Sequence, residues 1–340
     1  MISGRLCFAL LLWLLALPAF CGCDSDPCCE KIDGDKETDK DPDHTEYDWN
    51  WTEGDTAPTD GDDAFEDDGE SELSDDAEGE ADDKPFEEDI DGIPNPNPFI
   101  PFQGGFYSLG EDQSQDDEKP VHQVTMSRFE IQKYEVTVRE YQTCVKLGFC
   151  SPRHYATIAY DNACNYGNEN RINRPMNCVG WDGAMEYCAM IEALLPTEAQ
   201  WEIAARGSER RAYPWGEQPA TCERAQMHNN DGDGCGTNTT AVYNQFSGGA
   251  TPEAVYNLSG NVAEWVYDWY SENYSWCLDC TNPSGPADSP TKERVLRGGS
   301  YQSGPSELRG ADRQPVTGFD VPGSFPHAGF RCARTLEEGK

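Results

Sequence analysis

Positive charge is scarce in this sequence. Its 340 residues include 25 Lys and Arg against 63 Asp and Glu, which gives a formal net charge of −38 at pH 7. A chain with this balance repels the phosphates of nucleic acids and of anionic lipid head groups. We therefore expect no nucleic-acid partner and no binding to a phosphate backbone.

Histidines and long apolar runs are also scarce. The chain has five histidines, and none of them pair at a spacing typical of metal ligands, so a histidine-held metal centre is not expected. The apolar run from Leu6 to Leu17 is shorter than the ~20 residues that a membrane-spanning helix needs. Preceded by Arg5, this run is instead typical of the core of a signal peptide.

The residues after this run indicate a lipid anchor. Gly22-Cys23 resembles a lipoprotein signal site, although Phe20 stands where such sites usually have leucine. We expect residues 1–22 to be a signal peptide and Cys23 to carry the lipid. The protein would then be exported and anchored to a bacterial membrane, in the periplasm or on the cell surface, with no other membrane contact. The alternative is an ordinary secretory peptide followed by structural cysteines.

Most of the negative charge lies in one segment. Residues 24–91 contain 31 Asp and Glu against four Lys. So charged a segment, with few large apolar residues, cannot bury enough surface to offset its chain entropy. We expect an acidic disordered tether over residues 23–99, ending in Asn95-Pro96-Asn97-Pro98, then a domain over 100–335 and a tail over 336–340.

Cysteines are abundant, with 15 in the chain and an even number, ten, in the predicted domain. Thiols in such numbers persist mainly as disulfides in an oxidising compartment, which agrees with export. Cys222 and Cys235 form a plausible local bridge. The Cys277-Leu-Asp-Cys280 motif is interpreted as a structural pair rather than a redox site, because that is the commoner role in exported domains.

Three helices are predicted. Thr137 and Glu140 form a capping box before a helix with Val138, Tyr141, Gln142 and Val145 on one face. A second helix is expected from about Asp182 to Leu194. A third follows the capping box of Thr197 and Gln200 and ends at Gly207.

The remaining sequence is rich in Gly, Pro, Asn, Tyr and Trp, with only short apolar runs. This composition predicts an α+β domain with short strands, long loops and little regular secondary structure. Long helices do not alternate with strands, so a doubly wound sheet is excluded.

Eight sequence blocks, in this order, resemble the sulfatase-modifying-factor (formylglycine-generating enzyme) family. They are Gly104–Phe106, Pro120–Val124, Tyr134–Thr137, Arg174–Trp181, Leu195–Gly207 (LPTEAQWEIAARG), Asn257–Trp265 (NLSGNVAEW), Arg297–Tyr301 (RGGSY) and Gly329–Arg334 (GFRCAR). The resemblance implies a C-type-lectin-like α+β fold. It also implies a disulfide between Cys188 and Cys332.

The family's catalyst is a copper oxidase that converts a sulfatase cysteine to formylglycine with two cysteines of its own. In this sequence the positions that correspond to those cysteines are Ser303 and Leu308. Copper(I) prefers soft thiolate ligands, whereas a serine hydroxyl is a hard, weak ligand and leucine offers no donor atom. Copper is therefore not expected, and no catalytic residue is assigned.

Calcium is the cofactor that the resemblance implies. Asn257, Gly260, Val262 and Glu264 match the family's calcium loop, which supplies two side-chain oxygens and two backbone carbonyls. Calcium takes 6–8 hard oxygen ligands, and a glycine-containing turn lets carbonyls converge. The alternative is a plain turn before a strand.

These observations favour a non-catalytic binding module of the cell envelope, with a protein, peptide or glycan as ligand. The alternative is a formylglycine-generating oxidase, or another oxidative enzyme that uses the same pocket. The aromatic segments Trp265–Tyr270 and Tyr274–Trp276 could line a binding surface, but Trp and Tyr are more often part of a core.

Overall fold

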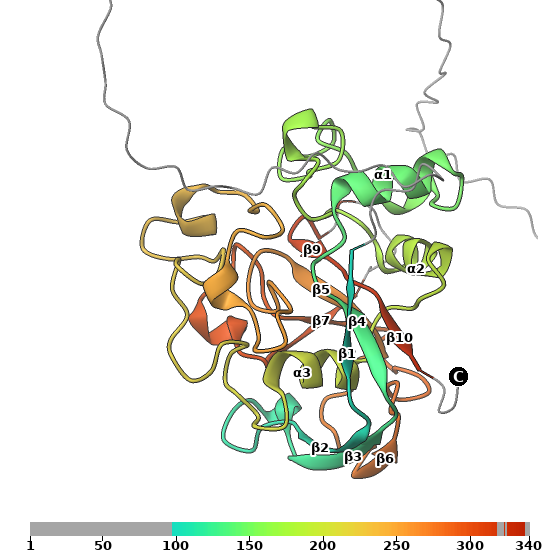
Figure 1. Cartoon of the computed structure of the whole chain (residues 1–340), viewed down its shortest axis with the longest axis vertical. Helices are drawn as coiled ribbons and strands as arrows, with labels where there is room; N and C mark the ends of the chain where they lie inside the picture. Colours follow the sequence, from blue (N-terminus) through green and yellow to red (C-terminus); the bar gives the residue numbers. More distant parts are fainter. Residues whose placement is uncertain (1–96, 318–322, 324, 337–340) are drawn as a thin grey trace, which may run out of the picture. The chain divides into compact units, whose positions relative to one another are not determined.

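The computed structural model describes residues 97–317, 323 and 325–336. The predicted signal peptide, Cys23 and nearly all of the predicted tether lie outside these residues. Three helices and ten short strands are described, joined by long loops (Figure 1). The helices are α1 (Val138–Lys146), α2 (Trp181–Met190) and α3 (Glu198–Arg206).

The strands form three small sheets. The first has the order β1-β4-β10, the second β2-β3-β6 and the third β8-β7-β5-β9. Their bounds are β1 Phe99–Phe102, β2 Gly105–Leu109, β3 His122–Met126, β4 Phe129–Gln132, β5 Ala263–Trp269, β6 Asp279–Thr281, β7 Arg294–Arg297, β8 Arg313–Val316, β9 Ala328–Gly329 and β10 Ala333–Thr335. Strand β1 begins at Phe99, one residue before the predicted start of the domain at residue 100.

Both predicted capping boxes are confirmed. The Thr137 side chain accepts from the backbone N–H of Glu140, and the Glu140 carboxylate accepts the Thr137 N–H in return. Thr197 and Gln200 make the same exchange at the start of α3. Gly207, at φ 63°, ends α3 as expected.

The second helix is shorter than predicted. It ends at Met190, because Glu192 adopts φ 56° and turns the chain out of the helix. Leu194 then pairs with Ala333 through two backbone hydrogen bonds. The apolar spacing continues past the helix end because the next residues face the same core, and spacing alone could not show this.

Helix α3 is the centre of the domain. All nine of its residues are buried, and it contacts strands from each of the three sheets. A helix surrounded in this way has no solvent face for its charged side chains. Its carboxylates and guanidinium must therefore find partners inside the protein.

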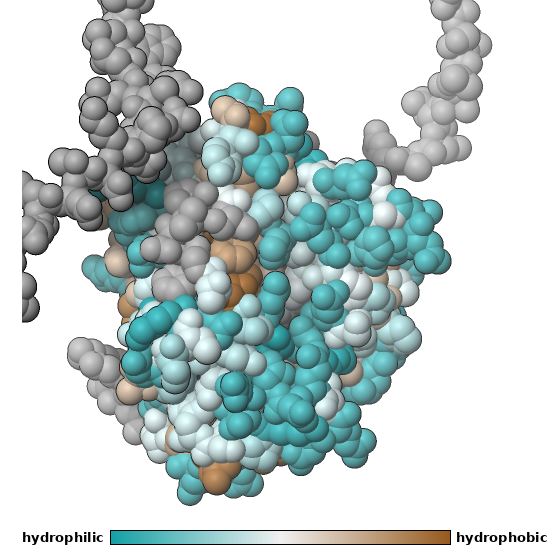
Figure 2. Space-filling view, turned by 180° about the vertical axis from the view of Figure 1, so that it is seen from behind, coloured by the Kyte–Doolittle hydropathy of each residue, from teal (hydrophilic) through white to brown (hydrophobic). Residues whose placement is uncertain are grey.

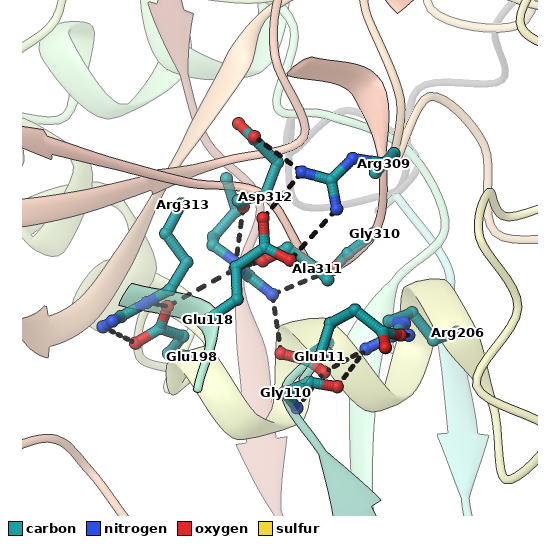
Figure 3. A network of polar contacts seen from close by, with 12 residues as sticks. Gly110, Glu111, Glu118, Glu198, Arg206, Arg309, Gly310, Ala311, Asp312 and Arg313 are labelled. Carbon is teal, nitrogen blue, oxygen red and sulfur yellow. Dashed lines mark hydrogen bonds and ion pairs between the residues drawn. The ribbon is translucent and has the colours of Figure 1, made fainter. Parts of the chain in front are cut away.

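Two arginines meet the Glu202 carboxylate of α3, and one of them, Arg206, is labelled in Figure 3. Arg206 Nη1 lies 2.8 Å from its Oε1, and Arg297 Nη2 of β7 lies 2.8 Å from its Oε2. The backbone N–H of Gly110 also donates to Oε1 at 2.8 Å. One buried carboxylate thus joins α3, the end of β2 and β7.

Glu198, one turn earlier on α3, is held in a similar way. Arg313 of β8 donates to both of its oxygens, at 2.7 and 2.9 Å, and the Tyr274 hydroxyl donates at 3.1 Å. Although burial acts to raise it, Arg313 and Arg297 hold the pKa of Glu198 below its ordinary value. Glu198 is therefore a carboxylate at neutral pH.

The ten cysteines of the described residues are all in disulfides. The pairs are Cys144–Cys150, Cys164–Cys178, Cys188–Cys332, Cys222–Cys235 and Cys277–Cys280. The pair Cys188–Cys332 that the family resemblance implies is present, and so is the local bridge Cys222–Cys235. Cys188–Cys332 connects α2 to the segment before β10 across 144 residues.

The surface of the domain is mainly polar. Figure 2 shows a largely hydrophilic face on which hydrophobic residues form small, separate areas. Within the described residues, no helix has the length and apolar character needed to cross a bilayer.

Replacing Glu202 with Ala should lower the free energy of unfolding by roughly 3 kcal/mol, because it removes the buried carboxylate that two buried guanidinium groups share. The anions that remain are farther away, Glu111 at 3.1 Å from Arg206 and Glu198 at 3.5 Å from Arg297. Urea unfolding of the purified domain measures this loss. The matched control is Asp288→Ala, which removes an exposed pair with Lys292 and should cost much less, because solvent screens that pair. Equal losses for the two variants would show that the buried network is not what stabilises the fold.

Candidate functional site

The candidate site is the β7–β8 loop (residues 298–312), which contains the positions of the family's cysteine pair. Gly298 and Gly299 open the loop with φ 86° and 64°, values that L side chains rarely adopt. A Cβ atom on Gly298 would lie 2.9 Å from the indole of Trp201. The tight approach to α3 therefore requires glycine and fixes the direction in which the loop leaves the sheet.

Neither Ser303 nor Leu308 offers a thiolate that could bind copper(I). The Ser303 hydroxyl accepts from the Ser300 N–H at 3.1 Å. Leu308 is fully buried in an apolar cluster with Ala225 and Met227. Leu308 thus belongs to a small apolar core under the loop, and its buried side chain is not available to a ligand.

Three polar side chains, those of His228, Asp233 and Gln302, border the loop, and sequence reasoning did not identify them. His228 Nδ1 lies 2.7 Å from Asp233 Oδ1, and Gln302 Nε2 donates to Asp233 Oδ2 at 3.4 Å. The backbone N–H of His228 donates to the Ser303 carbonyl at 2.9 Å. These groups offer hydrogen-bond donors and acceptors to a polar ligand, and they have no soft atom for copper(I).

Of the predicted calcium ligands, Asn257, Gly260 and Val262 lie in the turn before β5, and Glu264 lies in β5 itself. The carbonyl of Asn261 in that turn accepts from the Tyr301 N–H at 2.9 Å. The Asn257 amide donates to the Glu135 carboxylate and to the Tyr243 carbonyl, both at 2.8 Å. Sequence reasoning missed Glu135, although it lies within the block Tyr134–Thr137.

Glu264 is occupied by other partners. Arg331 donates to both of its carboxylate oxygens, at 2.6 and 2.7 Å, and the Trp201 indole donates to Oε2 at 2.9 Å. Glu264 and Arg331 are fully buried. A calcium ion at this carboxylate would have to displace a guanidinium group that carries a like charge.

The residues present therefore fit a calcium ion poorly at Glu264. Within the residues that the structure describes, no group of three or more His, Cys, Asp or Glu side chains is arranged to hold a metal. Glu135 is the other carboxyl group nearby, and burial, together with the Glu264 carboxylate, raises its pKa to about 8. This geometry favours the alternative of a turn before a strand, and the calcium site stays a prediction.

The aromatic segments are mostly core. Trp265 is fully buried and donates to the Val179 carbonyl at 2.9 Å, and Tyr274 is 4% exposed. Trp269 is half-buried, with the Arg294 guanidinium 3.6 Å from its ring centroid. Tyr270 is the member of these segments that borders a surface hollow, of about 580 Å³, whose floor includes Arg313.

Calcium should change the melting temperature of the domain by less than about 3 °C, the shift that corresponds to about 1 kcal/mol in a domain of this size. Thermal unfolding with a chelator, and then with millimolar calcium, measures this. Magnesium is the control ion. A larger rise with calcium alone would show that Glu264 leaves Arg331 to bind the ion.

The comparisons with known proteins agree with the fold described above. A sequence profile of the sulfatase-modifying factor enzyme 1-like domain matches residues 92–336. The serine/threonine-protein kinase Pkn1 of Chlamydia trachomatis serovar L2 is 31% identical over 268 residues, which cover 74% of this chain and 40% of the kinase. The chain thus spans about two fifths of the length of that relative.

Proteins named formylglycine-generating enzymes are also similar. The enzyme of Thermomonospora curvata is 30% identical over 288 residues, covering 69% of this chain and 92% of the enzyme. The mouse enzyme is 29% identical over 285 residues, which cover 69% of this chain and 74% of the enzyme.

Among solved structures, PvdO from Pseudomonas aeruginosa matches with a TM-score of 0.58 at 22% identity, over 74% of this chain and 97% of PvdO. Treponema denticola variable protein 1 matches with a TM-score of 0.55 at 20% identity, over 70% and 95%. These likenesses confirm the predicted α+β fold with little regular secondary structure. The chain belongs to the family of sulfatase-modifying factor enzyme 1-like domains.

Proposed function

We propose that this protein is an exported, lipid-anchored component of the cell envelope whose domain binds a protein, peptide or glycan without catalysis. The observation that carries the proposal is the chemistry at Ser303 and Leu308. Copper(I) requires thiolates, and one position offers a hydrogen-bonded hydroxyl while the other is a buried hydrocarbon.

The other cysteines do not compensate. Each of the ten in the described residues is already bonded to another cysteine, so none offers a thiolate to copper in the β7–β8 loop. Fold alone does not supply an activity, because one fold carries different sites in different proteins.

The proposed binding surface is the β7–β8 loop with its polar border of His228, Asp233 and Gln302. The loop is held by backbone hydrogen bonds from both sides, including Gly234 N–H to the Tyr301 carbonyl at 2.6 Å. A loop that is fixed before binding loses little conformational entropy when a ligand arrives. This rigidity supports a recognition role for the exposed side chains on the loop.

The second candidate is a formylglycine-generating oxidase or another oxidative enzyme that uses the same pocket. The similarity over 92% of the enzyme from Thermomonospora curvata favours it. It requires a route to oxygen activation that does not use thiolates at residues 303 and 308.

The purified domain should produce no aldehyde when it is incubated with a Cys-x-Pro-x-Arg peptide, copper(I) and oxygen, because it lacks the thiolate pair that binds the metal. Mass spectrometry of the peptide detects the product. The Streptomyces coelicolor formylglycine-generating enzyme, assayed in parallel, is the positive control. Turnover by this domain above the protein-free blank would establish the oxidase instead.

Replacing Cys23 with Ala should move most of the protein from the membrane fraction to the soluble fraction of a bacterial host, because it removes the acylated residue. Fractionation followed by immunoblotting measures the change. Cys21→Ala is the matched control, since that cysteine lies two residues away and should not affect anchoring. Loss of anchoring in both variants, or in neither, would contradict lipidation at Cys23.

A further inference from the structure

The segment Trp276–Cys280 contains a disulfide that lies between the protein surface and a buried cavity. Cys280 lies in β6 and is half-buried, whereas Cys277 is 1% exposed. Leu278, between them, is 59% exposed. Cys280 is therefore the more accessible cysteine of the pair, and Cys277 is enclosed by protein.

This disulfide closes a very small loop. Its cysteines are three residues apart, whereas those of the other four pairs are 6, 13, 14 and 144 residues apart. The entropic stabilisation from a disulfide increases with the length of the loop it closes. Stabilising the fold is thus a weaker reason for Cys277–Cys280 than for any of the others.

A cavity of about 10 Å³ lies against Cys277, with room for about one water molecule. Asp268, His122, Tyr274 and Trp276 also line it. The indole N–H of Trp276 is buried and has no hydrogen-bond partner among the described residues. The cavity therefore has a polar lining that can hold a water molecule next to the enclosed sulfur.

Asp268 is suited to carry a proton in this cavity. It is 2% exposed, and its Oδ2 accepts the Glu198 N–H at 2.8 Å. Burial, and then the neighbouring Glu198 carboxylate, raise its pKa well above the ordinary value, against the opposing effect of Arg313 and Arg294. The Asp268 side chain consequently retains its proton to a higher pH than an ordinary aspartate does.

We propose that Cys277–Cys280 is a redox-active disulfide that exchanges with a dithiol of a partner protein, with Asp268 supplying a proton to Cys277 through the cavity. This activity is separate from the binding role proposed for the β7–β8 loop. The exposed Leu278 gives the partner an apolar contact beside the sulfur that it attacks.

The exchange follows ordinary thiol–disulfide chemistry. A thiolate of the partner attacks Cys280 Sγ, the Cys277–Cys280 bond breaks, and Cys277 leaves as a thiolate that takes a proton from Asp268. The partner's second thiol gives up its proton to solvent and attacks the partner's sulfur in the mixed disulfide, which releases Cys280 as a thiolate. Cys280 and Asp268 then each take up one proton from solvent. The partner is oxidised to a disulfide by two electrons, and this protein is reduced to a dithiol.

A direct test uses limiting dithiothreitol as the dithiol, with alkylation and mass spectrometry of each cysteine pair over time. Cys222–Cys235 is the internal control, because both of its cysteines are half-buried, as Cys280 is. Cys277–Cys280 should be reduced at least ~10-fold faster than the control pair. Equal or slower reduction would overturn the proposal.

The Asp268→Asn variant tests the proton donor. Asn keeps the acceptor for the Glu198 N–H but has no acidic proton, so reduction of Cys277–Cys280 near pH 7 should slow by ~10-fold or more. Cys222–Cys235 should be unaffected. An unchanged rate, or equal slowing of both pairs, would refute the role of Asp268.

The Cys277→Ser/Cys280→Ser variant tests whether the bond is needed for the fold. Its free energy of unfolding should lie within about 1 kcal/mol of that of the native protein, because a disulfide that closes so short a loop removes little entropy from the unfolded chain. A loss of several kcal/mol would show that the disulfide is structural and would contradict the proposal. If Asp268→Asn does not fold, the comparison of the two pairs in the native protein decides alone.

Discussion

Placing a short helix at the centre of a domain, with charged residues on every turn, requires that each charge meet an opposite charge inside the protein. A buried pair need not add stability, but breaking one leaves a buried charge without compensation. Helix α3 meets this constraint through Glu198, Glu202 and Arg206, which reach β7, β8 and the end of β2 (Figure 3). Two of the three sheets, β2-β3-β6 and β8-β7-β5-β9, are joined to the helix through these contacts.

The same constraint explains which sequence blocks identify the family. Glu202 comes from the block Leu195–Gly207, and its partner Arg297 begins the block Arg297–Tyr301. Glu264 ends the block Asn257–Trp265, and its partner Arg331 lies in the block Gly329–Arg334. In this protein each charge is buried against its partner, so these blocks are joined in pairs inside the domain. They mark the fold and carry no information about copper chemistry.

Sequence reasoning was reliable where the physical signal is local. Helices α1 and α3 follow from capping boxes of four residues, and the missing thiolates follow from the identities of residues 303 and 308 alone. It failed where contacts join distant segments. Arg331 donates to the Glu264 carboxylate, which lies 67 residues away in the sequence, and Asn257 donates to Glu135 across 122 residues. No spacing rule predicts such pairs, and so the calcium ligands could be placed but not their competing partners.

The most direct measurement of the central claim is the affinity for copper(I), obtained by competition with a chromogenic chelator. The native domain and the Ser303→Cys/Leu308→Cys variant are compared under the same anaerobic conditions, with ascorbate to keep copper monovalent and no thiol reductant, so that the native disulfides stay intact. The account predicts that the native domain takes no copper(I) from the chelator and that the variant, which restores two soft ligands on the loop, does. Tight binding by the native domain, with an anomalous-scattering peak for copper beside Ser303, would contradict it.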